Sequence, residues 1–166
     1  MAMASRAGLL KPMRSWLLIS AVVIVLDLTT KSLVQGALQF GEHVPVTSFF
    51  DLVLFYNTGA AFSFLAGAGG WQHFLFSGFA VVASGIMLYL LHKHRDETWF
   101  CFALSLILGG ALGNLYDRLT VGHVVDFLYF HYAGYGFPAF NVADSAITCG
   151  VVVLLLDGLR KPNKNR

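Results

Sequence analysis

Two aspartates in an apolar stretch of the chain are the residues most suggestive of chemistry. Residues 122–145 read GHVVDFLYFHYAGYGFPAFNVADS, in which Asp126 and Asp144 are the only acidic side chains. No Lys or Arg lies between them or immediately beside either one. An ionisable group at membrane depth is costly, so each aspartate is a candidate for function.

Two carboxylates held close together do not both ionise easily and therefore share one proton. One then acts as general base on a water while the other hydrogen-bonds or protonates a substrate carbonyl, which amounts to peptide hydrolysis without a metal. A plainer alternative is that each aspartate orders a loop, with Asp144 capping a helix start. Spacing alone leaves both hypotheses open, although a site at membrane depth disfavours sugar hydrolysis, which also uses two carboxylates.

The seven remaining acidic residues are expected to have simpler roles. Asp27 stands four residues before Lys31, so the two share a helix face and can neutralise each other. The others are expected to pair with adjacent basic residues or to be solvated: Glu42, Asp51, Asp96, Glu97, Asp117 beside Arg118, and Asp157 beside Arg160 and Lys161.

The composition is that of a membrane protein. The 166 residues are 57% hydrophobic and 12% charged, with a mean hydropathy of +0.67, whereas soluble domains carry about 25% charged residues. The length suggests one domain over residues 1–166. A net charge of +2 is too small to suggest nucleic-acid binding. Cys101 and Cys149 are expected to be small buried hydrophobes, forming neither a disulfide nor a metal site.

Four apolar stretches are long enough to cross a bilayer. We expect spans over residues 16–33, 71–91, 99–115 and 139–156. A secretory signal peptide is the competing interpretation of the first stretch. A retained helix is favoured because no small-x-small cleavage site follows and three further spans come later.

The basic residues predict the orientation of these spans. Nine of the 11 Lys and Arg fall before the first span, between the second and third, or after the fourth: Arg6, Lys11, Arg14, Lys93, Arg95, Arg160, Lys161, Lys164 and Arg166. By the positive-inside rule these places and both termini are cytoplasmic. Residues 34–70 and 116–138 are then extracytoplasmic, and Asp126 and Asp144 both lie near the outer face.

The two outer segments predict different structures. Residues 34–70 contain the alternating stretch HVPVTSFFDLVLFYN and then GAGG, which indicates a small strand-rich element on the membrane. Residues 116–138 contain VVDFLYFHY, which fits a short interfacial helix or strand, followed by the breakers Gly134, Gly136 and Pro138. The expected fold is therefore an α-helical integral membrane protein. It has four transmembrane helices, a small β-rich extracytoplasmic element, and a second extracytoplasmic loop or helix. The two aspartates come from separate elements that could converge.

At these residues the chain resembles bacterial lipoprotein signal peptidase, or signal peptidase II, a family of aspartyl endopeptidases of the cytoplasmic membrane. The resemblance covers about residues 16–160 and rests on YNTGAAFSFL (56–65), GGALGNLYDRL (109–119), GHVVDF (122–127) and FNVADS (140–145). It implies removal of the signal peptide from prolipoproteins, just before a diacylglyceryl-modified cysteine. The implied enzyme needs no cofactor and meets its substrate among membrane lipids. Nothing in the sequence argues for an oligomer, so a monomer is expected.

The resemblance also assigns roles to residues. The family's catalytic aspartates fall on Asp126 and Asp144. The polar or close-packed positions around its site fall on Asp27, Lys31, Asn57, Gly110, Asn114, Arg118 and Asn141. One departure concerns the first span, where the family commonly has Asp-Gln-x-x-Lys and this chain has DLTTK, with Leu28 in place of Gln.

Two other functions fit a small membrane protein. One is a transporter or proton relay, in which Asp144 shuttles protons. The other is a structural subunit that packs through the small residues of GGALG. A relay needs titratable groups across the whole bilayer, and a packing subunit needs neither aspartate. The pairing of two carboxylates near one face favours the peptidase.

Overall fold

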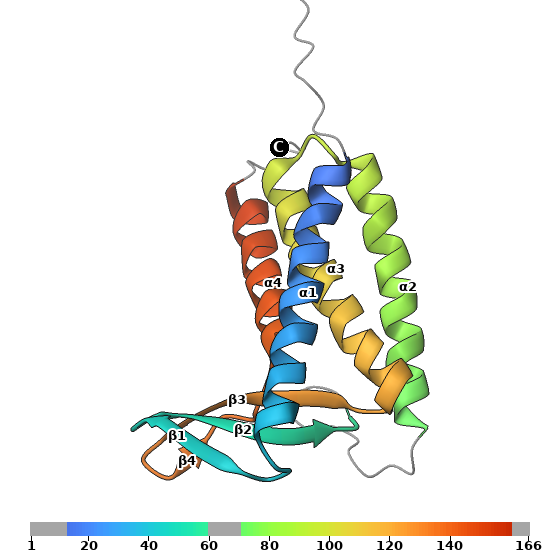
Figure 1. Ribbon diagram of the computed structural model, residues 1–166. Helices are drawn as coiled ribbons and strands as arrows, with labels where there is room; N and C mark the ends of the chain where they lie inside the picture. Colours follow the sequence, from blue (N-terminus) through green and yellow to red (C-terminus); the bar gives the residue numbers. More distant parts are fainter. Residues whose placement is uncertain (1–12, 60–70, 161–166) are drawn as a thin grey trace, which may run out of the picture.

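The computed structural model describes residues 13–59 and 71–160, which form a helical bundle capped at one end by a small sheet (Figure 1). The helices are α1 (Met13–Ala37), α2 (Gln72–Lys93), α3 (Thr98–Val121) and α4 (Val142–Arg160), each long and apolar enough to cross a membrane. The strands are β1 (His43–Thr47), β2 (Phe50–Asn57), β3 (Val124–Tyr132) and β4 (Tyr135–Gly136). The GAGG segment, most of YNTGAAFSFL and the basic residues Arg6, Lys11, Lys161, Lys164 and Arg166 lie outside these ranges. The predicted fold class is confirmed.

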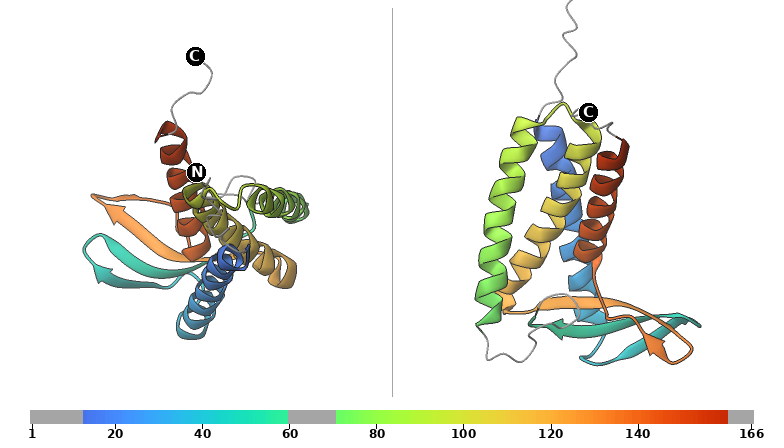
Figure 2. Two further views of the ribbon diagram at one scale, coloured as in Figure 1. Left: turned by 90° about the horizontal axis from the view of Figure 1, so that it is seen from above. Right: turned by 180° about the vertical axis from the view of Figure 1, so that it is seen from behind.

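The sheet differs from the expectation in one respect. All four strands form one antiparallel sheet in the order β1-β2-β3-β4, so the two outer segments build a single element. The predicted interfacial helix or strand of the second segment is the long strand β3. The right-hand view of Figure 2 shows the sheet at one end of the bundle, and the view from above shows that it extends sideways beyond the helices. The strand that carries Asp126 is thereby placed directly below the helices.

The third helix is longer than predicted. It was expected to end at residue 115, but α3 continues to Val121, so Asp117 and Arg118 lie on a helix rather than in an outer loop. No Gly or Pro interrupts residues 114–121. The helix ends at Gly122, which has φ 78° and takes the left-handed conformation that glycine adopts readily. This turn directs the chain from α3 into β3.

Glycines on α3 let two helices approach it closely. A methyl group at Gly109 would lie 2.7 Å from Cβ of Val23 on α1. A methyl group at Gly110 would lie 2.8 Å from Cγ1 of Ile147 on α4 and would press on the backbone carbonyl of Ala143. Since a real Cβ never sits so close, α1 and α4 could not occupy their places beside a larger residue.

Replacing Gly110 by Ala should lower the free energy of unfolding by about 1–3 kcal/mol, the usual cost of overpacking. The added methyl meets backbone of α4, which has no rotamer through which to move aside. Thermal unfolding of the purified protein in detergent would measure the effect. Gly85→Ala on α2 is the matched control, because nothing lies within 4 Å of its added Cβ. Equal midpoints for the two variants would contradict the close packing of α3 on α4.

The two faces of the sheet have different characters. Phe50 and Phe130 are opposite each other with ring centroids 4.8 Å apart, and Phe140 stacks on Phe130. Because side chains two residues apart share a face, Asp126 lies on the same face as Phe130. This face carries the aspartate toward the bundle.

Asp51 lies on the opposite face of the sheet, and the expectation that it is merely solvated is wrong. Asp51 is buried, with its carboxylate oxygens 3.0 Å from Nε2 of His131 and 3.3 Å from Nδ1 of His43. The hydrogen bond from His131 lowers the pKa of Asp51, and His43 adds to the effect. Asp51 therefore joins all three long strands, since His43 is on β1 and His131 on β3.

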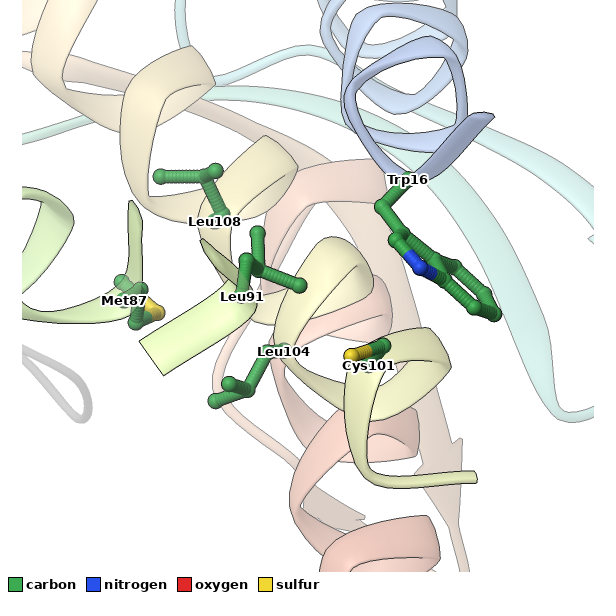
Figure 3. Packing of buried hydrophobic residues seen from close by; sticks show 6 residues of the cluster. All are labelled: Trp16, Met87, Leu91, Cys101, Leu104 and Leu108. Carbon is green, nitrogen blue, oxygen red and sulfur yellow. The ribbon is translucent and has the colours of Figure 1, made fainter. Parts of the chain in front are cut away.

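A hydrophobic cluster fills the other end of the bundle (Figure 3). Its buried residues come from α1, α2 and α3: Trp16, Met87, Leu91, Cys101, Leu104 and Leu108. Cys101 was expected to be buried and is. Cys149 was also expected to be buried, but it is exposed on α4, where it lines the cavity described below. Both thiols are free.

Candidate active site

Asp126 and Asp144 converge around the side chain of Asn141. Asn141 Nδ2 donates to Asp126 Oδ1 at 2.8 Å, while Asn141 Oδ1 accepts the backbone N–H of Asp144 at 2.9 Å. In return, the backbone N–H of Asn141 donates to Asp144 Oδ2 at 3.3 Å. This reciprocal pattern at the start of α4 is a capping box. Asp144 therefore does cap the start of α4, as the plainer alternative proposed. The same hydrogen bonds bring Asp144 beside Asp126.

Two further amides hold the aspartates. Asn114 Nδ2 on α3 donates to Asp144 Oδ1 at 2.8 Å, and Asn57 Nδ2 on β2 donates to Asp126 Oδ2 at 3.1 Å. Each carboxylate therefore accepts hydrogen bonds on both of its oxygens. Four elements, β2, β3, α3 and α4, supply the groups that make these contacts.

A buried cation lies one hydrogen bond further from the pair. Lys31 is only 2% exposed, and its ammonium contacts three acceptors: Asp27 at 2.7 Å, Asp117 at 2.8 Å and Asn114 Oδ1 at 2.9 Å. An ammonium has three N–H donors, so all of them are used. Asp27 also accepts the N–H of Ala143 at 2.9 Å, which ties α1 to the first turn of α4.

The partner of Asp117 was predicted incorrectly. Their adjacency in the sequence predicts an ion pair between Asp117 and Arg118, but in the structure the Asp117 carboxylate binds Lys31. Adjacent residues on a helix point in different directions, whereas Asn114 and Asp117, three apart, share a face. That spacing was the signal that sequence reasoning missed.

Arg118 lies beside the pair without bonding to it. Its guanidinium donates to the backbone carbonyls of Asn114 at 3.3 Å and Gly59 at 3.2 Å. It also lies 5.7 Å from the ring centre of Phe76. Its Nε is buried and has no hydrogen-bond partner within residues 13–59 and 71–160. The cation holds the end of β2 against α3.

A cavity of about 680 Å³ opens from the aspartates between α2, α3 and α4. Its polar end is formed by the two aspartates together with Asn57, Asn114 and Arg118. The rest is lined mainly by apolar side chains, among them Phe79, Ala83, Met87, Ile107 and Ile147. One end of this cavity suits polar atoms, and the remainder suits hydrocarbon.

The surroundings of Asp126 raise its pKa to about 7. Burial is the largest cause, because a desolvated carboxylate resists ionisation, and the nearby charge of Asp144 adds to it. Hydrogen bonds from Asn57 and Asn141 act in the opposite direction. Near neutral pH the pair can therefore hold one proton, as acid–base chemistry at two carboxylates requires.

Asp27 has a full set of partners although position 28 is Leu, where the family commonly has Gln. One of its oxygens accepts Ala143 N–H and the other accepts Lys31. Leu28 is half-buried on the same helix. The network around Asp27 is thus closed without a polar side chain at this position.

The residues singled out from the sequence come together in one place. Asp126, Asp144, Asn57, Asn114 and Asn141 form a single hydrogen-bond network. Asp27 and Lys31 join it through Asn114, Arg118 lines its cavity, and Gly110 allows α4 to approach. Within the described ranges, no group of three or more His, Cys, Asp or Glu residues is arranged to hold a metal ion.

Comparison with known proteins agrees with this geometry. The family model for signal peptidase (SPase) II matches residues 19–160. A lipoprotein signal peptidase of Ralstonia nicotianae is 55% identical over 146 residues, covering 88% of this chain and 84% of the relative. One of an Azoarcus species is 56% identical over 148 residues, covering 89% and 84%.

The fold is also shared with a solved protein. A bacterial membrane enzyme determined by the in meso method at 2.3 Å resolution superposes with a TM-score of 0.80 and 29% sequence identity. The match covers 92% of this chain and 95% of that one. By sequence along most of its length and by fold, the chain belongs to the signal peptidase II family.

Proposed function

We propose that Asp126 and Asp144 are the catalytic pair of this enzyme. As a member of its family, the protein is an aspartic peptidase of the bacterial inner membrane that removes signal peptides from prolipoproteins. The observation that carries the residue assignment is the network in which Asn141 and Asn114 draw the two carboxylates together at the polar end of a cavity. This arrangement needs no further group to activate water.

The reaction follows from one proton shared between two carboxylates. The ionised carboxylate takes a proton from a water molecule, whose oxygen attacks the scissile carbonyl carbon. The protonated carboxylate gives its proton to the carbonyl oxygen, which forms a neutral tetrahedral diol. When the diol collapses, the C–N bond breaks, the protonated carboxyl gives its proton to the leaving amine, and the other carboxylate takes a proton from a diol hydroxyl. The pair then again carries one proton.

The asparagines orient the carboxylates for this exchange. An amide N–H at each aspartate fixes the carboxylate plane without adding a charge. Arg118 lines the cavity beside the pair, and its positive charge is suited to stabilise negative charge that develops on the substrate. Fixed donors of this kind need little rearrangement as the reaction proceeds.

The apolar part of the cavity fits the diacylglyceryl group of a lipid-modified cysteine. We propose that substrate enters sideways between α2 and α4, with its acyl chains remaining in hydrocarbon. Each methylene buried there contributes about 0.8 kcal/mol to binding. The cysteine then lies near Asp126 and Asp144, and cleavage occurs just before it. Residues 34–70, which include β1 and β2, are the candidate cover for the bound peptide.

The charges at the two ends of the bundle support an outward-facing site. The start of α1, the turn from α2 to α3 and the end of α4 lie opposite the sheet (Figure 1), and these places carry Arg14, Lys93, Arg95 and Arg160. On the positive-inside rule we propose that this end is cytoplasmic, with both termini inside and the aspartates near the outer face. All groups of the site come from one chain, so we propose that the monomer is active.

The activity should depend on pH through the shared proton. Because the pKa of Asp126 is raised to about 7, kcat/KM should fall about tenfold per pH unit above that value, as the pair loses its proton. Rates of cleavage measured between about pH 5 and 9 would show this decrease in kcat/KM. Asp51→Asn should leave the decrease unchanged, because Asp51 lies on the opposite face of the sheet. A rate unchanged up to pH 9 would contradict the mechanism.

A cleavage assay tests the proposed function directly. Purified protein in detergent should cut a diacylglyceryl-modified prolipoprotein far faster than the same prolipoprotein without lipid. A chelator should have no effect, since the mechanism uses no metal. Equal rates on both substrates would contradict the role of the cavity, and loss of activity with chelator would point to a metallopeptidase.

A further inference from the structure

Asp117 is a buried carboxylate that the proposed chemistry does not use. It is 6% exposed, lies on α3, and is not among the residues that line the cavity. Its Oδ2 accepts two hydrogen bonds, one from Lys31 Nζ at 2.8 Å and one from the backbone N–H of Val125 at 3.3 Å. A single oxygen therefore joins α1, α3 and β3.

The contact with Val125 reaches one member of the catalytic pair. Val125 immediately precedes Asp126, and both residues are nearly inaccessible to solvent. The hydrogen bond from its N–H attaches the beginning of β3 to α3, just after the turn at Gly122. Because Asp126 projects from the next backbone unit, its position depends on this attachment.

The contact with Lys31 reaches the other member. Lys31 also donates to Asn114 Oδ1 at 2.9 Å. An ammonium can only donate, so the oxygen of the Asn114 amide must face Lys31 and its NH2 group must face away. That NH2 group donates to Asp144 Oδ1 at 2.8 Å. Asn141 Nδ2 also donates to this oxygen, at 3.2 Å, so Lys31 and Asn141 together fix which way Asn114 presents its amide to Asp144. Asp117 shares with Asp27 the task of holding Lys31 in place.

We propose that Asp117 is a positioning residue for both catalytic carboxylates, acting on Asp126 through the Val125 backbone and on Asp144 through Lys31 and Asn114. The inference rests on the proposed function of the aspartate pair. It makes Asp117 important for the rate of the chemical step and unimportant for substrate binding, because it does not line the cavity.

The contacts with Lys31 and Val125 both use Oδ2 of Asp117. Two substitutions at this position can therefore separate the loss of the acceptor oxygen from the loss of the charge. Asn at position 117 can keep an acceptor oxygen at the place of Oδ2, while it loses the charge and exchanges Oδ1 for an NH2 group; Asp27 remains as a counter-ion for Lys31. Ala removes the acceptor altogether. A role in positioning thus predicts that Asn preserves much of the activity that Ala loses.

The experiment measures kcat and KM for cleavage of a lipid-modified prolipoprotein by purified, folded variants. Asp117→Ala should lower kcat by about 10- to 100-fold with KM within about twofold of the unmodified enzyme, since small displacements of catalytic groups have effects of this size. Asp117→Asn should recover most of kcat. Asp96→Ala, which removes an exposed carboxylate at the far end of the bundle, should change neither constant.

Several results would overturn the inference: an Ala variant with normal kcat, a loss carried by KM, or equal losses for Ala and Asn. If the Ala variant does not fold, Asp117→Ser takes its place. Its hydroxyl can satisfy one donor but is too short to span both, so the same loss of kcat is expected. Failure of the unmodified enzyme to cleave would reject the proposed function, whereas cleavage by both it and the Ala variant would reject only the role of Asp117.

Discussion

Replacing either Asp126 or Asp144 by Asn should abolish cleavage of a lipid-modified prolipoprotein, with a loss of at least about 10³-fold in kcat. General acid–base catalysis is worth about 10²–10⁴-fold, and an amide supplies neither the base nor the acid. Asn has nearly the shape of Asp, so the cavity and the fold should remain. Product formation by each purified variant would be measured over long incubations.

The same substitution should have the opposite effect on stability. Since the pKa of Asp126 is raised from 3.8 to about 7, the folded state holds this proton more tightly than the unfolded state does. The ionised carboxylate therefore destabilises the fold. This cost is absent below about pH 4, grows as the pH rises, and reaches its full size above about pH 7, where it is at most about 4 kcal/mol.

Asp126→Asn should consequently unfold at a higher temperature than the unmodified enzyme above pH 7. The gain should shrink toward pH 4, because the carboxyl is then neutral in both states. Asp96→Asn, at an exposed position, is the control and should alter neither stability nor rate. Full activity in either of the catalytic-pair variants would remove the basis for the mechanism.

Replacing Lys31 by Met should lower the free energy of unfolding by about 3–5 kcal/mol, the usual result of removing one partner from a buried charge cluster. Met fills much of the same space but leaves Asp27 and Asp117 without their cation. It also releases the oxygen of Asn114, so activity should fall with stability. Thermal unfolding in detergent, together with the cleavage rate of the folded fraction, would measure both effects.

Two further variants make the Lys31 prediction specific. Adding Asp27→Asn and Asp117→Asn to Lys31→Met should restore part of the lost stability, because the unpaired charges disappear together. Lys93→Met, at an exposed lysine 5.8 Å from the ring centre of Tyr89, should cost little. If Lys31→Met unfolded at the same temperature as the unmodified enzyme, the cluster would not contribute to the fold.

The sequence was informative where a residue type conflicts with its surroundings. Four long apolar stretches with flanking Lys and Arg predict the bundle, and unpartnered Asp126 and Asp144 predict a site. The alternatives of a proton relay and a packing subunit do not agree with membership of a peptidase family. Local patterns of hydropathy and charge were enough for these conclusions.

Sequence reasoning failed where contacts join distant segments. The pairing of Asp117 with Lys31 spans α3 and α1, and that of Asp51 with His131 spans two strands far apart in the chain. Nearby residues in the sequence instead suggested an ion pair with Arg118 for Asp117 and plain solvation for Asp51. The real contacts depend on which helix faces meet and on strand register, and neither is encoded in a short window of residues.

The capping box at the start of α4 has a consequence for biogenesis. The ribosome delivers Asp126 well before Asn141 and Asp144, which arrive together with the last span. Until that span has inserted and its first turn has formed, Asp126 lacks its partner carboxylate. Since the bonds that begin α4 also bring the two carboxylates together, the proposed pair is incomplete in a nascent chain that lacks this span. If the proposed pair is catalytic, cleavage should begin only after the last span has joined the bundle.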